Sequence, residues 1–130
     1  MTGLDTNVVI RYLMHDDPTQ TSAAVKLVSS LTAEEPGFLS LIVVVEMVWV
    51  LESTYGFSKQ QIEEVLETLL RGKELRIERA DLVAQALRTF HASRADFSDC
   101  LIERCAHAAG CSYTATFDRA ASIAGMRLLT

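Results

Sequence analysis

The sequence predicts an α/β fold, a three-layer α/β/α arrangement around a central parallel sheet. Short segments with strand character alternate with longer segments in which apolar residues recur at helical spacing. This alternation is typical of a parallel sheet whose faces are covered by helices. The chain has 130 residues, 49 % of them apolar, and no linker-like or single-sign charged run interrupts it. We therefore expect one domain over residues 1–130 with a single core.

The first quarter of the chain predicts a strand followed by two helices. Residues 2–5 allow only a short strand, and "TNVVIRYL" then brings apolar residues back at helical spacing. Asp17 followed by Pro18 predicts the N-cap and first turn of the next helix. A tight strand-to-helix turn is therefore expected near Asp5.

The long apolar segment in the middle of the chain is expected to be a helix that follows a strand over residues 37–40. The β-branched run in "LIVVVEMVWVLES" favours a strand by propensity, but the length of the segment favours a buried helix. Gly56 is expected to cap this helix, Ser58 to begin the next one and Gly72 to end it.

The C-terminal part continues the alternation of strands and helices. A strand is expected over residues 75–78, a helix over "ADLVAQALRTFHAS", and another helix from about Asp96. The final segment, "CSYTATFDRAASIAGMRLL", predicts a strand, a short helix and a last strand.

Charge and composition restrict the partners and the compartment. The formal net charge of −5 disfavours a broad basic surface, so a nucleic-acid partner would require bound cations or a scattered basic rim. The sequence shows neither a leader segment nor an apolar run long enough to span a membrane, and a cytoplasmic protein is expected. The three cysteines lack metal-type spacing and are expected to be small buried residues, and the three histidines to be structural. The expected basic rim consists of Arg11, Lys26, Arg71, Lys73, Arg104 and Arg119.

Four acids are candidates for a functional site. Ligands of open α/β sheets bind beyond the carboxyl ends of the strands, where Asp5 follows the first strand and Asp118 follows "YTAT". Asp99 lies in the first turn of the helix before that later strand. Glu46 interrupts an apolar helix, and burying an unpaired carboxylate there requires a cation, a hydrogen-bond donor or a raised pKa.

Structural roles are an alternative for most of these acids. Asp5 and Asp118 also fit helix caps, and Asp96 and Asp99 fit acids favoured by a helix N-terminus.

Supporting groups are expected beside the acids. These are the hydroxyls of Thr6 and Thr116, the amide of Asn7 as a hydrogen-bond partner of Asp5, and the carboxylate of Asp96.

An all-carboxylate donor set favours Mg²⁺ or Mn²⁺ over zinc. Such an ion orients and deprotonates water and stabilises the charge that develops on a phosphodiester. No P-loop, G-x-G-x-x-G or G-x-S-x-G pattern is present, so nucleotide-cofactor and serine-hydrolase functions lose their main support. The sequence therefore predicts a metal-dependent nuclease.

The sequence resembles the PIN-domain ribonucleases, and among them the VapC-type toxins of bacterial VapBC toxin–antitoxin modules. The resemblance covers nearly the whole chain. It rests on "GLDTNVVIRYL", the glutamate of "VVVEMVWVL", "DFSDCLI" and "TATFDRAA", in this order.

The resemblance implies an endoribonuclease that binds divalent metal and leaves a 3′-hydroxyl on its RNA product. By position, Asp5, Glu46, Asp99 and Asp118 match the acidic quartet of the family, and Thr116 matches its small hydroxyl residue. The resemblance also implies a homodimer inhibited by a VapB-type antitoxin.

Two alternatives remain at this point. The segment "DTNVV" also resembles the aspartate loop of haloacid-dehalogenase-type phosphatases, in which Asp5 would be a nucleophile, but Asn7 stands where the second acid is required. A non-catalytic PIN-like module that binds RNA or protein is the other alternative.

Overall fold

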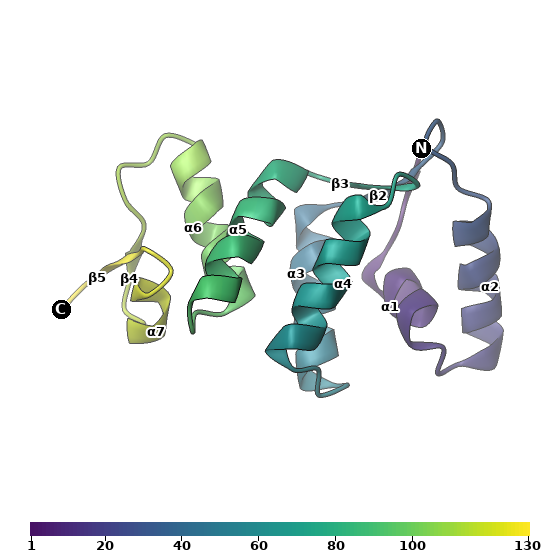
Figure 1. Cartoon of the computed structure of the whole chain (residues 1–130), viewed down its shortest axis with the longest axis horizontal. Coiled ribbons are helices and arrows are strands. Elements are labelled where there is room, and N and C mark those ends of the chain that lie inside the picture. The colour runs from purple at the N-terminus through teal and green to yellow at the C-terminus, as the bar shows by residue number, and fades with distance from the viewer. The chain divides into compact units, whose positions relative to one another are not determined.

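The computed structural model describes residues 1–130, and the chain divides into two compact units. The first unit comprises Met1–Glu78 and the second Arg79–Thr130. Figure 1 shows the helices and strands of each unit.

The first unit is built around a three-stranded parallel sheet. Its strands are β1 (Thr2–Gly3), β2 (Gly37–Leu39) and β3 (Leu75–Ile77), in the order β1-β2-β3. All pairs are parallel, with Thr2 opposite Gly37 and Phe38 opposite Arg76. Parallel neighbours require crossover connections, which the helices between these strands provide.

Four helices of the first unit begin and end close to the predicted residues. They are α1 (Thr6–Met14), α2 (Pro18–Ser29), α3 (Leu41–Ser53) and α4 (Lys59–Arg71). The Asp17 side chain caps α2 by accepting a hydrogen bond from the Gln20 backbone N–H at 3.0 Å. Ser58 begins α4 through a reciprocal capping box with Gln61, and Gly72 occupies its C-cap, as predicted.

The core of the first unit is formed by apolar side chains from the sheet and from α3 and α4. Leu39, Val44, Leu51, Ile62 and Leu66 are all 0 % exposed. Each such burial contributes about 1.5–3 kcal/mol before conformational entropy is subtracted.

The predicted end of α3 was wrong. The helix ends at Ser53, with Thr54 as its C-cap, and Gly56 lies in the following loop with a φ of 67°. The Ser53 hydroxyl donates to the Trp49 carbonyl at 2.7 Å, and the Thr54 N–H closes the last turn by donating to the Val50 carbonyl at 2.8 Å. Gly56 provides the left-handed turn beyond the helix, after which the Phe57 N–H donates back to the Leu51 carbonyl of α3 at 2.9 Å.

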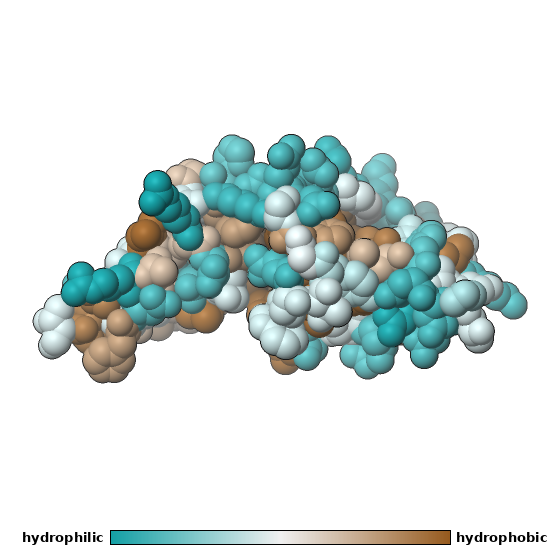
Figure 2. All heavy atoms as spheres, turned by 90° about the horizontal axis from the view of Figure 1, so that it is seen from below, coloured by the Kyte–Doolittle hydropathy of each residue, from teal (hydrophilic) through white to brown (hydrophobic).

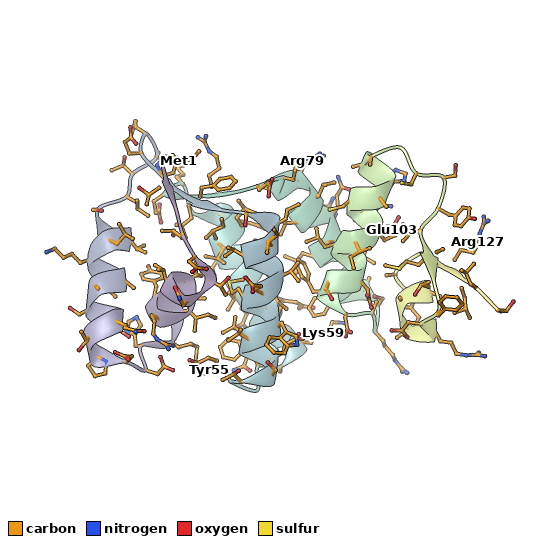
Figure 3. All side chains as sticks on the ribbon, turned by 180° about the vertical axis from the view of Figure 1, so that it is seen from behind. Met1, Tyr55, Lys59, Arg79, Glu103 and Arg127 are labelled. Atoms are coloured by element: carbon orange, nitrogen blue, oxygen red, sulfur yellow. The ribbon has the colours of Figure 1, made fainter.

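A polar cluster ties the α1–α2 turn to the segment after α3. The Tyr55 hydroxyl donates to Asp16, and Arg11 approaches the other oxygen of that carboxylate at 3.4 Å (Figure 3). Arg11 also donates through Nε to Gln20 at 2.7 Å. The hydrogen bond from Tyr55 holds the pKa of Asp16 below its usual range, and the same bond raises the pKa of Tyr55.

Replacing Tyr55 with phenylalanine is expected to lower the urea midpoint of unfolding at pH 7. The pKa of Asp16 is depressed in the folded protein, so the ionised carboxylate stabilises the fold. This contribution to the free energy of unfolding is complete above the unfolded-state pKa of about 4 and is lost as the pH falls through the lower folded-state pKa. The pKa of Tyr55 is raised, so its protonated phenol stabilises the fold at every pH below about 10. Urea titrations of wild type and Tyr55→Phe should show a difference in the midpoint of unfolding that is smaller at pH 3 than at pH 7. An equal difference in midpoint at pH 7 and pH 3 would show that the Tyr55 hydroxyl does not act through the ionised Asp16.

The second unit contains a helical pair and a small parallel sheet. Its elements are α5 (Ala80–Ala92), α6 (Phe97–Ala108), β4 (Ala115–Thr116), α7 (Arg119–Ser122) and β5 (Arg127–Leu128). Strand β4 pairs with β5 in parallel, with Ala115 opposite Arg127. The predicted strand, short helix and strand of the C-terminal segment are confirmed.

Helices α5 and α6 lie side by side and share an apolar interface (Figure 1). The rings of Phe90 and Phe97 meet edge to face, with centroids 6.0 Å apart and planes at 84°. Val83, Phe97 and Cys100 are almost completely buried. This interface fixes the first turn of α6, which carries Asp99.

The surface of the protein is of mixed character, and the burial of the cysteines agrees only in part with the prediction. Figure 2 shows hydrophilic side chains over much of the face that it draws, with apolar residues between them. None of the helices is both long and apolar enough to cross a membrane. The three cysteines form no disulfide, and only Cys100 is buried, while Cys105 is half-buried and Cys111 is exposed. Burial was wrong for Cys111 because this residue lies beyond the end of α6.

Candidate functional site

Two of the predicted acids meet at Thr6 in the first unit. Asp5 is the N-cap of α1, and its Oδ1 accepts a hydrogen bond from the Thr6 backbone N–H at 2.7 Å. The Thr6 hydroxyl donates to Glu46 Oε1 on α3 at 2.9 Å. One threonine therefore brings together two carboxylates that are far apart in the sequence. The second oxygen of each carboxylate, Asp5 Oδ2 and Glu46 Oε2, accepts no hydrogen bond.

The prediction that Glu46 is buried was wrong. Glu46 is exposed, and the structure contains no buried charged residue. Ile42 and Trp49, four residues before and three after it, are 73 % and 67 % exposed, so all three share one side of α3. The apolar sequence of α3 does not bury the helix on every side. Only the side that carries Val44, Met47, Val48 and Leu51 is buried.

Two further acids act on Asp99 in the second unit. Asp99 is half-buried in the first turn of α6. Burial raises the pKa of Asp99, and the negative charges of Asp96 and Asp118 raise it further. No positive side chain contributes to this shift, so the charge of the group is not compensated by the protein.

The capping alternative applies to Asp118 but not fully to Asp96. Asp118 is the N-cap of α7, where its Oδ1 accepts from the Ala120 N–H at 2.9 Å. Its own backbone N–H donates to the Thr116 hydroxyl at 3.0 Å, so Thr116 holds the turn that presents Asp118. Asp96 occupies the N-cap position of α6 but makes no capping hydrogen bond. Its side chain therefore remains available for another role.

The remaining predicted supports behave differently. Asn7 makes no hydrogen bond to Asp5, which is held by Thr6, and instead lines a hollow of about 280 Å³ between α1 and α2. In the predicted basic rim, Arg11 and Arg104 are held by Asp16 and Glu103. The three histidines are exposed.

The donor chemistry of both groups fits a hard divalent cation. Every candidate ligand is a carboxylate, and the uncompensated charge around Asp99 is the electrostatic condition that such a cation relieves. No three carboxylate, histidine or cysteine side chains form a group ready to hold a metal ion. We call Asp5 with Glu46 in the first unit, and Asp99 with Asp96 and Asp118 in the second, partial donor sets, because neither set is close enough to hold an ion as it stands.

Comparison with known protein families decides the classification. Residues 4–125 match the PIN domain. The chain belongs to the PIN-domain family. This confirms the resemblance and the α/β fold class.

A relative supports the placement within the PIN-domain family. A VapC ribonuclease from Aquifex aeolicus (strain VF5) is 26 % identical over 98 residues, which are 75 % of this chain and 73 % of that protein. No solved structure matches this PIN-domain chain. The haloacid-dehalogenase alternative is not favoured by these findings.

Sequence reasoning named Arg104 of this PIN domain as part of a basic rim but did not connect it with the polar residues around it. Arg79 and Arg88 on the α5 segment lie with Arg104 and His107 of α6 around one hollow. Their separation in the sequence gives no motif, and only the packing of α5 against α6 brings them together.

Proposed function

We propose that this PIN-domain protein is a metal-dependent endoribonuclease that uses Mg²⁺ or Mn²⁺. The observation that carries the proposal is the half-buried Asp99 carboxyl, whose pKa is raised by burial and by the charges of Asp96 and Asp118, with no positive side chain offsetting the shift. Membership of the PIN-domain family and the similarity to a VapC ribonuclease support it.

Asp5, Glu46, Asp99 and Asp118 are the proposed metal ligands and catalytic residues. Thr6 orients the carboxylates of Asp5 and Glu46 through the two hydrogen bonds described above. In the second unit, Thr116 fixes the backbone of Asp118.

Asp96 is proposed to support Asp99. Its side chain is not used as a cap, and it adds negative charge beside Asp99. Asn7 is the weakest of the proposed supports, because its contacts lie toward α2.

The proposed reaction is hydrolysis of an RNA phosphodiester. A bound Mg²⁺ or Mn²⁺ supplies Lewis acidity and lowers the pKa of a bound water. Attack of the water oxygen on phosphorus breaks the bond to the 3′ oxygen, which takes up a proton and leaves as a 3′-hydroxyl. The other product carries the 5′-phosphate.

Total bacterial RNA incubated with the purified chain tests this proposal. We expect discrete fragments with 3′-hydroxyl ends in Mg²⁺ or Mn²⁺ and none in EDTA, because the acids alone repel the phosphate. RNA that is bound but stays intact in every metal would identify a non-catalytic module instead. Radioactive phosphate transferred covalently to Asp5 would identify a phosphatase.

We further propose that the protein is the toxin of a type II toxin–antitoxin system and acts in the cytoplasm. The similarity to a VapC ribonuclease supports a VapB-type antitoxin partner and an RNA substrate. A homodimer is proposed on the same basis and predicts a solution mass of twice the 14.4 kDa chain by light scattering.

Induced expression in bacteria tests the toxin proposal. Growth is expected to stop soon after induction of wild type and to continue with Asp99→Asn, since arrest depends on RNA cleavage. Normal growth in cells that contain soluble, active wild-type enzyme contradicts a toxin role.

A further inference from the structure

The second unit contains a polar hollow of about 560 Å³ between α5 and α6, here called the α5–α6 groove. It lies at the N-terminal end of α5 and the C-terminal end of α6, so Asp99 is at the opposite end of α6. The polar side chains used in the argument are Arg79, Asp81, Gln85, Arg88, Arg104 and His107. None of them belongs to the proposed catalytic acids.

Two arginines of the groove each make two hydrogen bonds to a carboxylate. Arg79 donates through Nε and Nη2 to the two oxygens of Asp81, at 3.1 and 3.0 Å. Arg104 donates in the same way to Glu103, at 2.7 and 2.9 Å. Figure 3 labels Arg79 at the start of α5 and Glu103 on α6. A guanidinium has five N–H donors, so each arginine keeps three for another acceptor.

The backbone at Arg79 supports a specific role for this residue. Its φ of 46° is left-handed, which is uncommon for a residue with a side chain. Arg79 occupies the N-cap of α5 without making a side-chain cap. Left-handed backbone at a residue with a side chain is one of the features found at ligand sites, and the Arg79 side chain binds Asp81 in the groove.

Arg88 supplies the positive charge that no carboxylate neutralises. It is exposed, one turn after Gln85 on α5, and it forms no ion pair. His107 on α6 is exposed as well. In a chain with a net charge of −5, the groove collects three arginines and one lining carboxylate, Asp81.

We propose that the α5–α6 groove binds the phosphate backbone of the RNA substrate at a distance from the cleaved bond. This inference rests on the proposed ribonuclease function. Planar guanidinium groups match the oxygens of a phosphate, and Arg88 adds the attraction that the net charge of the chain opposes. The Gln85 amide both donates and accepts hydrogen bonds and suits a ribose 2′-hydroxyl.

Binding of a fluorescent single-stranded RNA in EDTA tests the groove without any cleavage. The variant is Arg88→Glu, because Arg88 is exposed and unpaired and its replacement should not disturb the fold. Its Kd is expected to rise about fivefold, and the slope of log Kd against log salt to fall by about 0.7, the loss of one phosphate contact to a single strand. The matched control is Arg76→Glu on β3, an exposed arginine of the first unit with the same change in charge.

The outcomes separate this inference from the proposed function. An unchanged Kd for Arg88→Glu, or an equal rise in Kd for Arg76→Glu, overturns the proposal that the groove binds RNA. This holds even if the wild type cleaves RNA. A selective effect of Arg88→Glu supports the groove even if no metal produces cleavage. Binding of an acidic polyglutamate peptide that depends on Arg88, with RNA binding unaffected, overturns the RNA assignment in favour of a protein partner.

Discussion

Asp99→Asn is expected to reduce metal-dependent RNA cleavage by more than about a hundredfold. Loss of a residue that merely orients a metal ligand typically costs about 10–100-fold, and Asp99 is proposed as a ligand itself. The amide removes the negative charge but nearly preserves the shape of the side chain. Because Asp96 and Asp118 repel the charge of Asp99, the Tm of the variant should stay the same or rise. Initial rates of cleavage at saturating Mg²⁺ and thermal unfolding measure the two effects.

Asp17→Asn is the matched control for this experiment. Asp17 is also an aspartate at the start of a helix, but it caps α2, and asparagine caps equally well. Its cleavage rate should equal that of wild type. If Asp99→Asn cleaves at the wild-type rate, Asp99 is not a ligand and the proposed site is wrong.

A double variant addresses whether both partial donor sets serve one reaction. Asp5→Asn with Asp99→Asn should be about as slow as the slower single variant, because groups that act as a unit do not lose rate additively. Multiplicative losses would mean that the two acids act independently.

Phe97→Ala is expected to destabilise the protein by about 3–5 kcal/mol, the range for removing a large aromatic side chain from a core. Phe97 is 1 % exposed and packs edge to face on Phe90, so its loss leaves a cavity at the first turn of α6. The corresponding fall in Tm is roughly 10–20 °C for a chain of this size. Cleavage should fall as well, because Asp99 lies two residues further along.

Phe117→Ala is the control for this change in stability. Phe117 is 82 % exposed, and its replacement should change stability by no more than about 0.5 kcal/mol. Equal Tm values for the two variants would show that the α5–α6 interface does not limit stability. Calorimetry of both proteins at one pH makes the comparison.

Local signals in the sequence were sufficient for the order of the elements. Asp17 with Pro18, and Ser58 with Gln61, act through side chain to backbone contacts within a few residues, so their effects are readable from the sequence. The end of α3 was not readable in this way. Gly56 does take a left-handed φ of 67°, but α3 already ends at Ser53, before the glycine.

The candidate site depended more on contacts between distant segments. Asp5 and Asp118 were placed correctly after strands, because sheet topology constrains those positions. The exposure of Glu46 was missed, since the apolar residues around it do not reveal which side of α3 packs inward. The partnership of Thr6 with Glu46 spans α1 and α3 and becomes visible only in the folded unit.

The hydrogen bonds of Asp5, Glu46 and Asp118 also limit their denticity. Each carboxylate has one oxygen engaged by a protein donor, namely the Thr6 N–H, the Thr6 hydroxyl and the Ala120 N–H. While these bonds persist, each side chain offers one unengaged oxygen and is suited to monodentate coordination. Mg²⁺ requires about six oxygen ligands, so several positions would be left to water and to phosphate oxygens. In either unit, an ion held in this way would take most of its oxygen ligands from outside the protein.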